Sequence, residues 1–330
     1  MCKGKHGYYA SAGYYKKQYW IRDTVYSMES LLSHGDAYQV KKQLLHTLRR
    51  QRKDGEIPAR LIEVPPSVSG SLRLLDPRLF YPYTENHDSN LLTTIGLYRY
   101  AMFTNDAGLL KQHSDEADKL SSFTKSLLNA EGFLPGADWR DAMRKYAGRS
   151  LFCNQVLLFA AERLSGNTDS ADRLKERINS VFWRDDVGYY RDYAEESGDH
   201  PVFDSLGHAL AVLEGLVPKS RIEAVVRAFD LASTEFGYRN LSPSYPKSEC
   251  GQKPERYQNS AIWPFVHGYV ISALLKAGFE ERARKEFDKF TKLSGFNEWY
   301  SPNSGAPMGS HGQLFSAALY LRAHDLVSTA

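Results

Sequence analysis

The 330-residue sequence lacks the features that define several common protein classes. Its three cysteines, at positions 2, 153 and 250, are too widely spaced for a disulfide framework or a zinc site, which predicts free thiols. No apolar run approaches the ~18 residues of a membrane-spanning helix, and the polar start has no apolar signal-peptide core. We therefore expect a cytoplasmic protein without a membrane partner.

Charge of one sign is also scarce. The sequence holds 42 lysines and arginines against 39 acidic residues, for a formal net charge of +3, and the basic residues are scattered among the acids. The lack of a basic stripe argues against a nucleic-acid partner. Neither common type of glycine-rich phosphate loop is present, and no Gly-x-Ser-x-Gly elbow occurs. These absences disfavour nucleotide chemistry and the usual serine hydrolases.

What the sequence does have is helical periodicity and many aromatic residues. Apolar residues recur at helical spacing, as in Val40, Leu44 and Leu48, whereas alternating strand patterns are scarce. We predict about eleven helices, mostly in antiparallel pairs. Aromatic residues make up 13% of the chain, and rings with polar groups suit a pocket that is apolar on one side and wet on the other. The predicted helices begin near residues 20, 38, 88, 106, 150, 168, 203, 219, 257, 280 and 312.

Long loops separate the predicted helix pairs and alternate with short ones. In a ring of helical hairpins this alternation places every long loop on one rim, where polar groups converge on a central pocket. No flexible linker divides the chain, so we expect one domain over residues 1–330. An open solenoid is also built from helical hairpins, but the sequence shows no repeat of about 30–50 residues, the length that is usual for solenoids. The long loops are residues 54–88, 132–149, 188–204, 234–256 and 295–311.

Two loop segments contain candidate catalytic carboxylates. Residues 136–143 read Gly-Ala-Asp-Trp-Arg-Asp-Ala-Met, and residues 295–302 contain the lone acid Glu298 among aromatic residues. A carboxyl group beside an aromatic wall can stay protonated as a general acid, while a second carboxylate activates water, which is the pair that glycoside hydrolysis needs. The alternative is that Asp138 or Asp141 only caps a helix or pairs with an arginine.

Further polar clusters precede apolar helices. Arg22 and Asp23 open the first clear helix and could hold vicinal sugar hydroxyls, or could form only a helix-terminal ion pair. Residues 85–88 and 255–264 likewise could bind sugar hydroxyls or could have only a structural role at the start of a helix. The dispersed histidines keep open a sugar epimerase on the same barrel, which needs two of them facing each other in the pocket. They are His87, His208, His267 and His311.

At these segments the sequence resembles the α/α-barrel glycosidases, especially glycogen-debranching amylo-1,6-glucosidases and the related glucoamylases and trehalases. Residues 20–24 are similar to the family's Trp-x-Arg-Asp segment, and residues 139–143 to its Trp-Met-Asp-x-Met segment. Residues 257–264 are similar to Tyr-His-Asn-Gly-Ser-x-Trp-Pro, with Gln258 in place of the histidine. Residues 297–305 and 312–318 resemble the loop and last helix that carry the catalytic base.

The resemblance implies a fold and a set of roles. The fold is an all-α (α/α)6 barrel. Because the sequence starts so close to the Trp-x-Arg-Asp segment, we expect the first helix to be missing, to be replaced by a partner subunit or to lie outside this sequence. Asp141, rather than Asp138, is the general acid and Glu298 the general base, while Arg22 and Asp23 grip the terminal sugar. The remaining residues expected to bind substrate are Trp20, Asp88, Trp139, Tyr257, Asn259, Trp263, Trp299 and Gln313.

The resulting hypothesis is an inverting, exo-acting glycoside hydrolase that releases terminal α-linked glucose from an oligosaccharide or small glucoside. Inversion needs room for a water molecule, so we expect the two carboxyl groups to be about 6.5–9.5 Å apart. A small carbohydrate is the expected partner, and no metal or organic cofactor is implied. Mannosides, sucrose-like substrates and glycerate conjugates stay open, as do a homo-oligomer and a non-catalytic carbohydrate-binding barrel.

Overall fold

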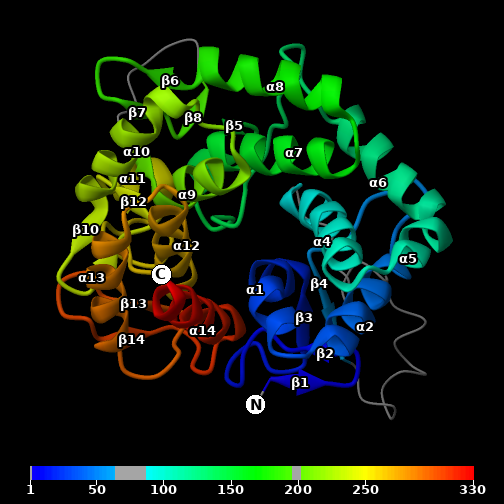
Figure 1. Ribbon diagram of the computed structural model, residues 1–330, viewed down its shortest axis with the longest axis horizontal. Coiled ribbons are helices and arrows are strands. Elements are labelled where there is room, and N and C mark those ends of the chain that lie inside the picture. The colour runs from blue at the N-terminus through cyan, green and yellow to red at the C-terminus, as the bar shows by residue number, and fades with distance from the viewer. Residues whose placement is uncertain (1, 64–86, 195–201) are drawn as a thin grey trace.

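The computed structural model describes residues 2–63, 87–194 and 202–330 as helices arranged in a ring (Figure 1). Six helices form the inner layer, and each packs against the next. The last of them also packs against the first, which closes the ring. The inner helices are α1 (Ile21–Ser33), α4 (Asp88–Thr104), α7 (Phe152–Leu164), α9 (Ser205–Glu214), α12 (Pro264–Lys276) and α14 (Leu314–Thr329).

An outer layer of helices covers the inner ring. Within the described residues, the first helix in the chain is α1, which belongs to the inner layer. Outer helices such as α8 and α13 bury one stripe only, whereas α4 and α12 are buried on nearly all sides and are correspondingly apolar. The outer helices are α2 (Ala37–Leu48), α5 (Ala107–Gln112), α6 (Ser114–Ser126), α8 (Thr168–Val181), α10 (Ile222–Ala228) and α13 (Glu280–Thr291).

Several helix boundaries differ from the sequence prediction. The helix expected near residue 257 begins at Pro264, because the preceding residues turn sharply, with positive φ at Tyr257 and Ser260. Proline suits the first helical position, where its missing N–H is not needed. The helix expected near residue 106 is two helices, α5 and α6, which meet at His113. A one-turn helix, α11 (Lys247–Cys250), was not expected.

Short antiparallel strand pairs fasten the loops together. Each strand has only two or three residues, which is too short for an alternating pattern to be visible in the sequence. Residues 64–86 of the loop predicted over 54–88 lie outside the described residues. The pairs are β1 (Lys3–Gly4) with β2 (Gly7–Tyr8), β3 (Gln18–Trp20) with β4 (Arg60–Ile62), β5 (Ser150–Leu151) with β8 (Tyr193–Ala194), β6 (Trp183–Arg184) with β7 (Tyr189–Tyr190), β9 (Phe203–Asp204) with β12 (Leu241–Ser242), β10 (Ser233–Thr234) with β11 (Gly237–Tyr238), and β13 (Trp299–Tyr300) with β14 (Pro307–Met308).

One large apolar core runs between the two helical layers and joins all six inner helices. Among the described residues, none of the helices combines the length and apolar character needed to cross a membrane. Helices α12 and α14 approach each other closely at Gly268. A Cβ atom added at Gly268 would lie 2.7 Å from the Cβ of Leu319 and 3.0 Å from its carbonyl oxygen.

The close approach of α12 and α14 predicts the effect of a single methyl group. Gly268→Ala should lower the free energy of unfolding by about 1–3 kcal/mol, because the added carbon forces the two helices apart. Gly108→Ala in α5 is the control, since a Cβ atom there would lie 3.4 Å from Oδ1 of Asp106, an ordinary contact, and alanine favours a helix. Urea denaturation measures both; equal stability of the two variants would contradict this packing.

Candidate active site

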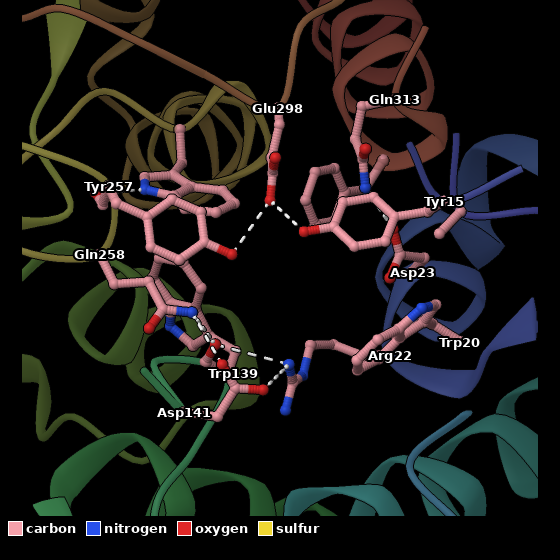
Figure 2. A pocket seen from close by; sticks show the side chains of 13 residues that line it. Tyr15, Trp20, Arg22, Asp23, Trp139, Asp141, Tyr257, Gln258, Glu298 and Gln313 are labelled. Atoms are coloured by element: carbon pink, nitrogen blue, oxygen red, sulfur yellow. Dashed lines mark hydrogen bonds and ion pairs between the residues drawn. The ribbon is translucent and has the colours of Figure 1, made fainter. Parts of the chain in front are cut away.

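A cavity of about 440 Å³ opens at one rim of the ring, where the segments leading into the inner helices meet (Figure 2). Its walls come from both ends of the chain and from three loops between. Of the five long loops predicted from the sequence, those over residues 132–149 and 295–311 contribute side chains to this cavity. The lining residues are Ala10, Tyr15, Trp20, Arg22, Asp23, Trp139, Asp141, Tyr257, Gln258, Trp263, Glu298, Gln313 and Phe315.

Glu298 lies just before β13 and projects toward the cavity. Its Oε1 accepts hydrogen bonds from the hydroxyls of Tyr15 at 3.1 Å and Tyr257 at 3.2 Å, and its Oε2 accepts one from the Ser310 N–H at 3.0 Å. Burial raises the pKa of Glu298, and these three hydrogen bonds only partly offset that effect. The carboxylate is thus held firmly and is more basic than an exposed glutamate.

Asp141 lies across the cavity from Glu298 (Figure 2). Its side chain is 26% exposed, and it forms an ion pair between Oδ2 and Nη1 of Arg22 at 3.2 Å. Nε2 of Gln258 donates to Oδ1 at 3.1 Å, while Oε1 of the same glutamine accepts the Ala142 N–H at 2.8 Å. Two side chains from distant segments therefore fix the direction of this carboxyl group.

Arg22 is held from behind by Asp88. Nε of Arg22 donates to Oδ2 of Asp88 at 2.8 Å, and Nη2 donates to Oδ1 at 3.2 Å. Both side chains are buried, and Asp88, predicted to bind sugar, does not line the cavity. Burial raises the pKa of Asp88, and the guanidinium partly counteracts this. The structure places Asp88 as the support of Arg22 rather than as a wall of the cavity.

Asp23 and Gln313 form a second polar part of the cavity lining. Nε2 of Gln313 donates to Oδ1 of Asp23 at 2.7 Å. Burial raises the pKa of Asp23 to about 7, although Arg22 and Gln313 both lower it. Oε1 of Gln313 is buried without a hydrogen-bond partner among the described residues. This oxygen is available to accept a hydrogen bond from a ligand hydroxyl.

Aromatic rings supply the apolar part of the cavity. Trp139 and Trp263 meet edge to face, with ring centroids 5.0 Å apart, and Trp20 lines a further side. Two predicted binding residues lie elsewhere. Asn259 is buried and bonds the backbone N–H and carbonyl of Tyr245, so it shapes a loop. Trp299 lines a neighbouring groove instead of the cavity.

Four lining residues were not predicted from the sequence: the apolar Ala10 and Phe315, and the polar Tyr15 and Gln258. Tyr15 belongs to the tyrosine-rich start of the chain, but nothing in the local sequence singles out this ring. Gln258 stands out in the sequence only as a departure from the histidine of the resembled segment. Its double contact with Asp141 and the Ala142 N–H depends on two loops that are distant in sequence, and no local pattern reveals it.

The loop that carries Asp141 rests on a buried charge cluster. Arg140 contacts Asp138 through Nη2 at 2.6 Å, Asp192 through Nη1 at 2.8 Å and Asp204 through Nη2 at 3.3 Å, and all four side chains are fully buried. Burial raises the pKa of Asp204 to about 7. The arginine-partner interpretation therefore applies to Asp138, whereas Asp141 faces the cavity.

The same cluster contains the grouping most similar to a metal site in the described residues. Ligand atoms of Asp138, Cys153 and Asp204 lie within 4.8 Å of one another. The Arg140 guanidinium already contacts both carboxylates and supplies the positive charge that an ion would bring. This donor set fits a structural ion cluster rather than a metal cofactor.

Histidines are not found among the described residues that line the cavity. His208 and His267 are buried and bond backbone groups, and burial lowers their pKa values to about 3 and about 4. Neither can serve as an acid at neutral pH, and neither reaches the cavity. The part of the chain that the structure describes thus lacks the facing pair of histidines that the epimerase alternative requires.

Solved structures show the fold of this chain. A wild-type glycosidase superposes with a TM-score of 0.72 at 14% identity, covering 99% of this chain and 93% of its own. The GH63 mannosylglycerate hydrolase from Thermus thermophilus, in complex with glucose, gives 0.70 at 16% identity, with coverage of 98% and 96%. The fold is therefore an (α/α)6 barrel.

Sequence comparison finds similarity to mannosylglycerate hydrolases over part of the chain. Residues 157–316 match the mannosylglycerate hydrolase MGH1-like glycoside hydrolase domain. The mannosylglycerate hydrolase of Rubrobacter radiotolerans is 24% identical over 156 residues, which are 46% of this chain and 35% of that protein. The chain thus spans about a third of the length of the curated relative that it matches, and it is similar to these hydrolases in sequence as well as fold.

The buried cluster predicts a strong effect of Arg140. Arg140→Met should lower the free energy of unfolding at pH 7 by about 3–5 kcal/mol, because three buried carboxyl groups lose their shared cation. The loss should shrink as the pH is lowered, since protonated carboxyl groups are cheaper to bury. Denaturant titrations at several pH values measure it. The control is Arg227→Met, which removes an exposed pair with Glu223; equal losses would contradict the cluster's role.

Proposed function

We propose that the protein is an inverting, exo-acting glycoside hydrolase in which Asp141 is the general acid and Glu298 the general base. The observation that supports this proposal is the placement of two carboxyl groups from distant segments on opposite sides of one cavity (Figure 2). Glycoside hydrolysis with inversion needs one group to protonate the leaving oxygen and another to deprotonate water on the opposite face of the sugar.

The hydrogen bonds of Glu298 suit a base. A carboxylate offers about four acceptor positions, and Tyr15, Tyr257 and the Ser310 N–H occupy three of them. The remaining position can accept a hydrogen bond from water. The same three donors fix the direction of the carboxylate, so that the water molecule is activated at a defined place. The raised pKa of Glu298 makes it a better proton acceptor.

The surroundings of Asp141 suit an acid that reaches the glycosidic oxygen. Its partly exposed carboxyl group lies at the mouth of the cavity, and Arg22 and Gln258 orient it. A group that gives a proton to the leaving oxygen must contact both the sugar and the departing part of the substrate, and Asp141 has this access. The following residue, Ala142, already borders the neighbouring groove.

The cavity suits one terminal sugar. Its polar groups, from Arg22, Asp23 and Gln313, can bind hydroxyls, while the tryptophans cover the apolar faces of a ring. We propose a terminal α-linked hexose, with glucose as the first candidate because solved relatives hold glucose. Mannose is the second, because the curated relative is a mannosylglycerate hydrolase.

Sugar release from α-glucosides, α-mannosides, sucrose and hexosyl glycerates tests the proposal. Asp141→Asn and Glu298→Gln should each lower kcat by about 10²- to 10⁴-fold on the substrate that the wild type cleaves, because each removes one proton transfer. The controls are Asp172→Asn and Glu176→Gln on α8, both exposed and outside the cavity. A folded protein that releases no sugar from the panel would contradict the proposal and favour a carbohydrate-binding barrel.

The pH dependence of kcat/KM should report Glu298. A base must be unprotonated to act, so activity should fall as the pH drops through its raised pKa, above the usual 4.5. Tyr15→Phe removes a hydrogen bond that stabilises the charged form, so the acidic midpoint should move upward by about half a pH unit or more. Tyr14→Phe, at a ring that is 80% exposed, is the control. A downward shift in Tyr15→Phe would contradict the assignment.

A further inference from the structure

An open groove of about 990 Å³ lies beside the cavity and shares Tyr257 with it. It runs between the loop after Asp141 and the loop after α11. Nε2 of Gln252 donates to the Ala142 carbonyl at 3.2 Å, which ties the two loops together. The groove is lined by Ala142, Arg144, Gly251, Gln252, Lys253, Arg256, Tyr257 and Trp299. It therefore lies next to the cavity, with Tyr257 between them.

Three cationic side chains line this groove, and its lining contains no acid among the described residues. Arg144, Lys253 and Arg256 are exposed, and within residues 2–63, 87–194 and 202–330 none of them has a carboxylate within ion-pair distance. The stem of Arg144 passes over Gly251, so that a Cβ there would lie 3.3 Å from the arginine Cδ. The groove thus carries three cationic side chains, and the stem of one of them, Arg144, lies against its Gly251 wall.

The acids closest in sequence to these cations are engaged elsewhere, beginning with Asp141, which pairs with Arg22 at 3.2 Å. Glu249 pairs with Lys145, and Glu255 pairs with Arg239 at 3.0 Å. Oε2 of Glu255 also accepts a hydrogen bond from Asn303 at 2.8 Å. The positive charge of the groove is therefore not neutralised from its own loop, although the whole chain carries a formal charge of only +3. An anion is the chemistry that fits this surface.

The groove also lies where the leaving group of the proposed reaction must go. The general acid protonates the oxygen of the leaving group, so this part of the substrate lies on the side of Asp141. Ala142, the next residue, borders the groove. Tyr257 and Trp299 add aromatic surface to the lining, which suits a sugar ring. The cations then specify an acidic substituent on that ring.

We propose that this groove binds a negatively charged sugar of the leaving group, so that the substrate is an acidic oligosaccharide in which a neutral terminal hexose caps a uronate or a sulfated sugar. This inference rests on the proposed function for the position of the leaving group. It goes beyond it in naming a second binding site, Arg144, Lys253 and Arg256, and the charge of the unit bound there.

Matched disaccharides test this site. They carry the terminal hexose that the substrate panel identifies, linked to glucose, to glucuronate or to glucose 6-sulfate. The wild type should show a KM for the acidic compounds that is on the order of tenfold lower, as expected for a few exposed charge contacts. Higher salt should remove the preference. The carboxylate and sulfate compounds show which anion the groove prefers, and equal KM values for all three would overturn the proposal.

The triple variant Arg144→Gln, Lys253→Gln and Arg256→Gln should bring the ratio of neutral to acidic KM close to one. The control triple variant Lys111→Gln, Lys219→Gln and Lys285→Gln removes the same charge from exposed positions outside the groove and should keep the wild-type ratio. A groove variant that keeps the preference would overturn the proposal, as would a control variant that loses it, because the effect would then reflect net charge.

A binding measurement separates failure of the acidic-sugar site from failure of the proposed hydrolase function. Glu298→Gln should bind trigalacturonate or a sulfated heparin tetrasaccharide in calorimetry, and the added groove substitutions should weaken that binding on the order of tenfold. Salt-sensitive binding that depends on the groove, in a protein that hydrolyses nothing, would refute the proposed function but keep the acidic-sugar site. Hydrolysis without any preference or binding for acidic sugars would refute the site alone.

Discussion

The packing of α14 against α1 closes the ring and brings the two ends of the described chain together. This contact allows Gln313 to reach Asp23, Ser310 to reach Ser11, and Tyr15 to reach Glu298 across 283 residues of sequence. The hydrogen bond between Tyr15 and Glu298 and one wall of the cavity therefore depend on closure. In an open solenoid of the same hairpins these groups would be far apart, so ring closure is the condition for the site.

Buried charge is the second constraint on the site. Arg22 spans Asp88 and Asp141, and Arg140 joins three carboxylates beneath the loop that carries Asp141. Removing charges from water is costly unless each has a partner, so such clusters tolerate few arrangements. They hold the loop between α6 and α7 in one position. Asp138 and Asp141 thus have different roles within one motif: the first anchors the loop, and the second faces the cavity.

The sequence reveals the helices and the motif-bearing cavity residues, because helical periodicity and short motifs are local. It does not reveal contacts between loops that are distant in sequence, such as those of Gln258 with Asp141 or of Tyr15 with Glu298. Asp88 belongs to a segment that the resemblance places in the pocket, but it is buried behind Arg22. Which side chains become buried depends on how the helices pack, and the local sequence does not show this. Asn259 is likewise fixed by its bonds to Tyr245. The helix start at Pro264 differs from the expected 257 because positive φ angles at Tyr257 and Ser260 form a turn there.

The measurement that tests the account most directly is the anomeric configuration of the sugar first released, followed by NMR during hydrolysis of an α-glycoside. Two carboxyl groups on opposite sides of the cavity, with an acceptor position of Glu298 left for water, predict that the β-anomer appears first and then mutarotates. Initial release of the α-anomer would show retention through a covalent intermediate. It would contradict the roles assigned to Asp141 and Glu298.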